Sequence, residues 1–450
     1  MSNLDKNQPT LKTYHQYLII WIGQLISLIG SNIVQFVMIW WITIETQSAV
    51  YLSLATFFGY IPSVILSPFT GVLADKVDRQ KLIILADFLQ AFVTLLLICS
   101  FYFDMMQIWI YFLIISLRSI FQTLQGPAKY AIVSQMVPKE KLARLNGLDY
   151  FFSNIMSLIG APIAALLLNF FDIFQLLFVD IITFLIAIIP FFFIRIPKLA
   201  HIGDKVQLPS MGEYKEGIKE GFQFLRRNVG FFSLILTASF VNFFIMPFTS
   251  LLAYYINVDN GGTEQHLALV MMAQQAGLIF GGLITTIKPK RKNPMRFMQF
   301  ILTVQFIGFA IIGLAPLGSY WIMSLGMFVS GMTFPFTNTI ISTIFQKNVP
   351  NEVQGRISTV LGALSMLISP IGMIISGPLA NLMSTKLLFI VSSLIPIIAI
   401  QFIWKFTPIM DAEKIVQDNK SLEVLNNPEI MTEVVPVNIK EPREEQESLS

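Results

Sequence analysis

The ionisable residues that stand inside long apolar runs are the ones that could do chemistry in this chain. Arg118 lies near the middle of one such run, and Tyr111, Gln122 and Gln125 share its helical face at 100° per residue. A cation at that depth in a membrane is costly unless it faces protein or water. The pattern therefore predicts a polar stripe directed into a helix bundle, which serves either proton coupling or a purely structural ion pair.

Three acids also lie in apolar runs, and we expect different roles for them. Asp149 is the candidate proton carrier, because it lies on a small and polar helical face suited to a bundle interior. That face comprises Asn146, Asp149, Ser153, Ser157, Gly160 and Ala164. Asp87 follows a charged hairpin and is expected to brace Arg79 or Lys76, whereas Asp180 is expected to cap a helix or to pair locally.

A second small face lies in the run 355–381. Its members are Ser358, Gly362, Ser365, Ser369, Gly372 and Ser376. Small residues let helices approach closely, so we expect the small faces of both runs to be sliding contacts between two halves of the molecule.

Neutral polar side chains mark a candidate substrate cavity. Those of the first run share one face or lie beside it, and they suit either a wet cavity or hydrogen bonds between helices. Those of the second half stand among phenylalanines, which suits either a soft, adaptable pocket or ordinary core and lipid contacts. The candidate cavity residues are Gln24, Ser31, Asn32, Gln35, Gln122, Gln125, Asn242, Met246 and Asn338.

The composition places these residues in a polytopic membrane protein. Of the 450 residues, 54% are hydrophobic and 13% are charged, and the mean hydropathy is +0.68. A helix needs about 20 apolar residues to cross a bilayer. Runs of that length predict twelve spans, at 17–43, 50–74, 82–103, 107–135, 142–168, 173–194, 230–256, 266–287, 295–315, 320–345, 355–381 and 386–407.

The spans divide into two groups of six. Residues 1–194 and 230–408 are expected to form an N-terminal and a C-terminal six-helix bundle, and 195–229 a cytoplasmic linker with an amphipathic helix. The octad 137–144 recurs at 349–356, which supports an internal repeat. Lys and Arg gather in the even-to-odd connections, so both termini are expected in the cytoplasm. The acidic segment 409–450 is expected to be a disordered cytoplasmic tail.

The hairpin between the second and third spans resembles a motif of the major facilitator superfamily. Its sequence, Gly71-Val-Leu-Ala-Asp-Lys-Val-Asp-Arg-Gln-Lys81, matches that motif at Gly71, Asp75, Lys76 and Arg79, among others. Asp78 and Gln80 depart from the motif, which has Gly and commonly a cation at these positions. The resemblance implies a twelve-helix major facilitator fold in which the four matching residues serve conformational gating.

The segment from Arg118 to Pro127 resembles the fourth-helix motif of drug:proton antiporters in that superfamily. Together with Ile22-Gly-Gln24 and Val137-Pro, it resembles the macrolide-efflux-like branch. The resemblance implies export of hydrophobic or amphipathic compounds by proton antiport and alternating access, from a monomer in a bacterial inner membrane. Siderophore export and lysophospholipid transport belong to the same branch and remain open. A non-transporting receptor or scaffold that uses the acidic tail is disfavoured by the preserved motifs.

An enzyme is not expected. The three histidines, His15, His201 and His266, form no metal-ligand spacing with carboxylates or with Cys99, and no phosphate-binding Gly-rich loop with its Lys is present. We expect no metal, cofactor or nucleic-acid partner. The proton gradient is the expected energy source.

Overall fold

Long helices make up nearly all of the described chain. The computed structural model describes residues 9–76, 78–194, 196, 229–287, 293–349, 362 and 367–413, with the backbone alone for 68, 69, 71–76, 348, 411 and 413. The first six helices are α1 (Leu11–Thr46), α2 (Ala49–Lys76), α3 (Arg79–Tyr102), α4 (Ile108–Met136), α5 (Lys139–Leu167) and α6 (Ile173–Phe193). The others are α8 (Val229–Tyr254) with the π-helical turn η2 (Tyr255–Asp259), α9 (Glu264–Ile287), α10 (Pro294–Leu314), α11 (Tyr320–Asn348), α13 (Ser369–Met383), α14 (Thr385–Phe406) and the short η3 (Pro408–Glu413).

Short connections with local caps separate the helices. Gln47 closes α1 in a left-handed conformation, with φ of 44°, and its N–H donates to the carbonyl of Thr43. Asp78 caps α3, because its Oδ1 accepts from the backbone nitrogens of Gln80 and Lys81 at 3.1 and 3.4 Å. Neighbouring helices are therefore held antiparallel by tight turns.

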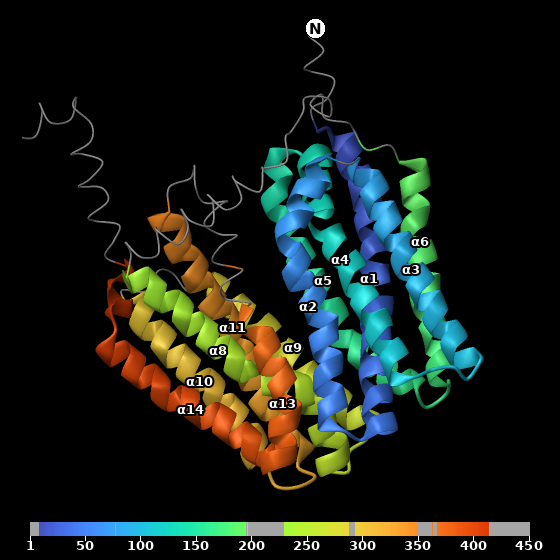
Figure 1. Cartoon of the computed structure of the whole chain (residues 1–450). Helices are drawn as coiled ribbons and strands as arrows, with labels where there is room; N and C mark the ends of the chain where they lie inside the picture. The colour runs from blue at the N-terminus through green and yellow to red at the C-terminus, as the bar shows by residue number, and fades with distance from the viewer. Residues whose placement is uncertain are drawn as a thin grey trace, which may run out of the picture.

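The predicted all-α membrane fold is confirmed. Within the described ranges, ten helices are long and apolar enough to cross a membrane. Of the remaining long helices, α11 has 29 residues and α13 has 15, and both lie within the bundle of the second half (Figure 1). The predicted eleventh span begins at 355, and its first part falls largely outside the described residues.

The helices gather into two bundles that lean together at one end. Figure 1 shows α1–α6 in one bundle and α8–α14 in the other, converging at the end opposite to the start of α1. The bundles contact each other along α2 with α13 and along α5 with α9. At the convergent end, the Gln265 Nε2 of α9 donates to Asn169 Oδ1 in the turn after α5, at 3.0 Å. The predicted linker helix and the acidic tail beyond Glu413 lie outside the described residues. The first residues of the predicted tail, 409–413, belong to η3 instead, because Ile409 and Ala412 are buried in the core.

Candidate functional site: two polar layers and an apolar seam

A buried carboxylate on α6 joins four helices of the first bundle. Asp180 Oδ1 accepts from Ser31 Oγ of α1 at 3.0 Å. Its Oδ2 accepts from Thr94 Oγ1 of α3 at 2.8 Å and from Arg118 Nη1 of α4 at 2.7 Å. The same Arg118 nitrogen also donates to Thr94. We call these four residues the Asp180 layer.

The Asp180 layer corrects the expectation about Asp180. Asp180 was expected to cap a helix or pair locally, but it is bonded to side chains of α1, α3 and α4. Arg118 faces the bundle interior as predicted, and it forms an ion pair with Asp180. The side chains of Arg118 and Asp180 are 16% and 7% exposed. Removal of one partner of such a buried pair strongly destabilises the protein, because the other charge is left uncompensated.

A second carboxylate, on α3, forms a second layer. Asp87 Oδ2 accepts from Gln24 Nε2 of α1 at 3.1 Å, and its Oδ1 accepts from Gln125 Nε2 of α4. We call these three residues the Asp87 layer. Asp87 was expected to brace the charged hairpin, but its hydrogen bonds run to α1 and α4 instead, because its side chain is buried inside the bundle.

A common spacing of seven residues relates the two layers. The pairs Gln24 and Ser31, Asp87 and Thr94, and Arg118 and Gln125 are each seven positions apart on their own helices. Seven residues are two helical turns, or about 10 Å, so each helix contributes one side chain to each layer. This repeated spacing in three helices is a signal that the sequence contains and that our sequence analysis missed.

Asp149 lies near the Asp87 layer, on α5. Its Oδ1 accepts from Trp21 Nε1 of α1 at 2.7 Å, and the residue is exposed. Lys129 of α4, which the sequence analysis did not single out, interacts electrostatically with both Asp87 and Asp149. The signal for Lys129 was its position four residues after Gln125, on the polar stripe that begins at Arg118.

The other predicted cavity residues differ in their surroundings. Gln35, Gln122 and Asn338 are exposed, and Asn242 is half-buried. The side chain of Met246 packs against Gly372, since a Cβ placed at Gly372 would lie 3.0 Å from it. Asn32 packs against Gly160 in the same way, at 2.7 Å, and its buried Nδ2 has no hydrogen-bond partner among the described residues.

The two helices that carry the small faces, α5 and α13, do lie at the seam, and Ser369 of the second face hydrogen-bonds to Tyr60 of α2. One glycine of each face packs elsewhere. Gly160 lies against α1, and Gly372 lies against α8, so both pack inside their own bundles. The glycines that face the opposite bundle are Gly377 and Gly282. A Cβ at Gly377 would lie 2.6 Å from Val50 Cα of α2, and one at Gly282 would lie 3.6 Å from the Tyr150 ring of α5.

The charged hairpin is described in part. Gly71, Asp75 and Lys76 belong to the last turns of α2, and their side chains lie outside the description. Arg79 Nη1 donates to the Ala131 carbonyl of α4 at 3.4 Å. Gln80 Nε2 donates to the carbonyls of Phe191 and Ile194 at 2.7 and 3.2 Å, and its Oε1 accepts from Ile196 N at 3.4 Å. A cation at position 80 could not accept this last bond.

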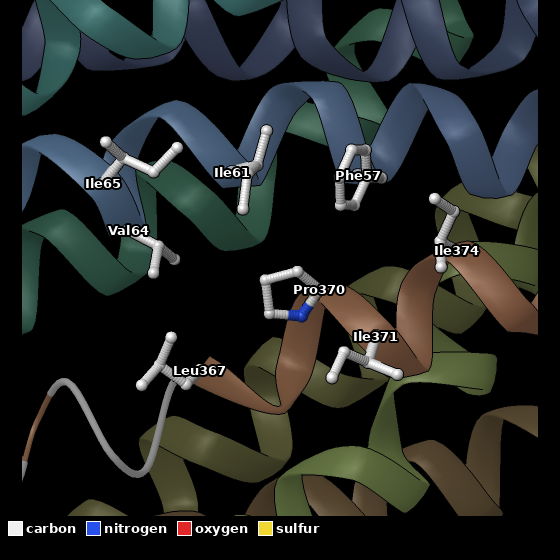
Figure 2. Close-up of a pocket in the computed structure, with 8 residues that line it drawn as sticks. All are labelled: Phe57, Ile61, Val64, Ile65, Leu367, Pro370, Ile371 and Ile374. Atoms are coloured by element: carbon white, nitrogen blue, oxygen red, sulfur yellow. The ribbon is translucent and has the colours of Figure 1, made fainter.

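An apolar cavity of about 510 Å³ lies at the seam between the bundles (Figure 2). Side chains of α2 line one side, and the other is lined by side chains of α13 and by Leu367, two residues before that helix. The lining residues are Phe57, Ile61, Val64, Ile65, Leu367, Pro370, Ile371 and Ile374. These residues do not stand out in the sequence, because an apolar helix stripe that lines a cavity has the same composition as one that faces lipid.

Comparisons with known proteins agree with this architecture. The sequence pattern of the Major Facilitator Superfamily matches residues 20–373. Macrolide efflux protein A of Streptococcus pyogenes is 30% identical over 379 residues, which cover 84% of this chain and 92% of that protein. The staphyloferrin A transporter of Staphylococcus aureus is 24% identical and covers 80% of this chain and 84% of its own length. The crystal structure of the nucleoside transporter NupG superposes with a TM-score of 0.70 at 13% identity, covering 86% of this chain and 99% of NupG.

Proposed function

Because the chain belongs to the major facilitator superfamily, we propose that it exports hydrophobic or amphipathic compounds, such as macrolide-like drugs, by proton antiport and alternating access. The protein is a multi-pass membrane transporter of small molecules rather than an enzyme. Its proposed setting is a bacterial inner membrane, where it acts as a monomer with both termini in the cytoplasm. The asymmetry of Lys and Arg between the loops supports this orientation.

The observation that carries the proposed substrate class is the apolar cavity at the seam. Its lining comes from both bundles, so a rocking motion of one bundle against the other would open and close it. Ligand sites of this size are typically lined by apolar side chains with few polar groups. An amphipathic compound would leave its polar part outside this lining.

Asp149 is the carboxylate that best suits proton exchange. Asp180 is held by three donors, one of which is the guanidinium of Arg118, and Asp87 is held by two buried amides. Asp149 is exposed and accepts a hydrogen bond from Trp21. A carboxylate that exchanges protons with water must be reachable from it, which favours Asp149. The proposed task of Arg118 is then to hold Asp180, and with it the packing of α4 against α3 and α6.

Gating is proposed for the hairpin that contains Gly71, Asp75, Lys76 and Arg79. The bond from Arg79 to the Ala131 carbonyl supports this proposal, because it ties the start of α3 to α4 beside the Asp87 layer. A change in the hairpin would therefore reach α3, which carries Asp87, and α4, which carries Arg118 and Gln125.

Siderophore export is a second candidate, supported by the similarity to the staphyloferrin A transporter. A polycarboxylate siderophore needs cations to bind it. In the interior of the first bundle, however, Arg118 is paired with Asp180 and Lys129 interacts with Asp87 and Asp149. The geometry therefore favours the macrolide-like class.

Purified protein in liposomes that contain a pH-sensitive dye tests the proposal. Addition of erythromycin should cause a protein-dependent proton flux, and lysophosphatidylglycerol or a citrate-based siderophore should not. Flux with the siderophore alone would replace the proposed substrate by the second candidate. Failure of every compound to move protons would exclude proton antiport of these classes.

A further inference from the structure

Lys129 is a half-buried cation in the interior of the first bundle. It lies seven residues before the end of α4, which places its Cα about 10 Å inside the helix. Gln125, one turn earlier on the same face, donates to Asp87. A lysine at this depth needs a charged or aqueous partner.

Two carboxylates on different helices supply that partner. Lys129 interacts electrostatically with Asp87 of α3 and with Asp149 of α5. Asp87 is buried, and its hydrogen bonds come from the neutral amides of Gln24 and Gln125. Asp149 is exposed, and its hydrogen bond comes from the neutral indole of Trp21. One cation therefore serves two acids.

The acids are also joined through α1. Trp21 and Gln24 are three residues apart and lie on the same side of that helix, and they donate to Asp149 and Asp87 respectively. Two further ionisable groups face this cluster. Tyr17 of α1 interacts with Asp149, and Asp180 of α6 interacts with Asp87.

The charge of the cluster depends on the state of Asp149. With both carboxylates ionised, one lysine and two acids carry a net charge of minus one, and a proton on Asp149 makes the cluster neutral. Unbalanced charge is costly in a low-dielectric interior. When Asp149 is protonated, the attraction that remains for Lys129 is toward Asp87.

We propose that Lys129 is a positioning residue for proton exchange, a shared counter-cation that pairs with Asp87 when Asp149 is protonated and is drawn toward Asp149 when it is ionised. This inference rests on the proposed proton antiport. It also connects charge to the seam between the bundles. The residue after Asp149 is Tyr150, whose ring lies 3.6 Å from a Cβ placed at Gly282 of α9. A change of pairing at Asp149 therefore occurs next to a contact that alternating access must break.

Site-resolved carbodiimide labelling tests the role of Lys129 without any transport assay. Dicyclohexylcarbodiimide reacts with protonated carboxyl groups, and mass spectrometry of peptides reports each acid separately. The full-length protein in detergent is labelled over a pH series, and the midpoint for Asp149 is compared between the unaltered chain and Lys129→Gln. Loss of a nearby cation favours the protonated acid, so Asp149 should be labelled more heavily in Lys129→Gln than in the unaltered chain at the same pH.

Three comparisons isolate the charge. Lys129→Arg should keep the midpoint, and so should Lys139→Gln, which makes the same change at an exposed lysine at the start of α5. Labelling of Asp180, whose cation is Arg118, should not move. If Lys129→Gln does not fold, the comparison is made in an Asp87→Asn background, where removal of the lysine leaves no buried acid without its cation.

An Asp149 midpoint that is the same with and without Lys129 would overturn the inference. If the unaltered protein shows no erythromycin-driven proton flux, the proposed function is overturned, but the labelling result for Lys129 is not affected. The two failures are therefore distinguishable.

Discussion

Arg118 and Asp180 form a buried ion pair that joins α4 to α6, with Nη1 2.7 Å from Oδ2. The same carboxylate is bonded to Thr94 and Ser31, so the pair fixes the relative positions of four helices. The pair lies about two helical turns from the Asp87 layer, in which the hydrogen-bond donors to the acid are neutral amides. The first bundle thus separates an acid that is paired with Arg118 from two acids that interact with Lys129.

Replacement of Arg118 by alanine should destabilise the protein by about 3–5 kcal/mol, because it leaves the buried Asp180 without its cation. Arg118→Lys should recover part of that loss, since lysine keeps the charge but lacks the planar fork. The double variant Arg118→Met with Asp180→Asn removes both charges and should be more stable than Arg118→Ala. Thermal unfolding in detergent measures all three. An alanine variant as stable as the unaltered protein would show that the pair does not hold the bundle.

The depth of Arg118 could be predicted from sequence, but its partner could not. Apolar runs of spanning length fix the number and approximate limits of the helices, and the cost of a buried cation directs Arg118 inward. Arg118 and Asp180 are 62 residues apart, and the contact between them depends on how three helices pack. A single sequence contains no direct measure of that packing.

Other errors have similar physical causes. Lys129 was missed because it lies near the end of its apolar run, where a lysine can also reach the membrane surface. The small faces of α5 and α13 lie on helices of the seam as expected, but Gly160 and Gly372 pack inside their own bundles, because small residues serve packing within a bundle as well as between bundles. The apolar cavity was missed because lipid-facing and cavity-facing stripes share the same residue types.

Gly377→Ala should disfavour the arrangement in which α2 and α13 touch. A Cβ at this position would lie 2.6 Å from Val50 Cα and 2.7 Å from the Ala49 carbonyl oxygen, and neither backbone atom can move freely. We expect transport to fall at least several-fold while the yield of folded protein changes little. Gly147→Ala is the matched control, because a Cβ there meets no atom within 4 Å. Equal transport by both variants would contradict a close seam at Gly377.

Ile371→Trp should weaken transport of bulky compounds by filling the apolar cavity. Ile371 lines that cavity on α13, and an indole would occupy part of its volume of about 510 Å³. The expected result is a rise in the apparent KM for erythromycin of about tenfold, with folding unchanged. Leu382→Trp is the control, since Leu382 lies on the same helix, is 82% exposed and does not line the cavity. An unchanged KM in Ile371→Trp would place the substrate elsewhere.

The most direct test of the proposed mechanism is the separation of proton-driven transport from substrate exchange in Asp149→Asn. In liposomes, an imposed pH gradient should drive accumulation of radiolabelled erythromycin by the unaltered protein and by the control Asp172→Asn, which alters an exposed acid at the start of α6. The Asp149→Asn variant should lose this accumulation but still exchange labelled for unlabelled erythromycin. Gradient-driven accumulation by Asp149→Asn equal to that of the unaltered protein would contradict the account.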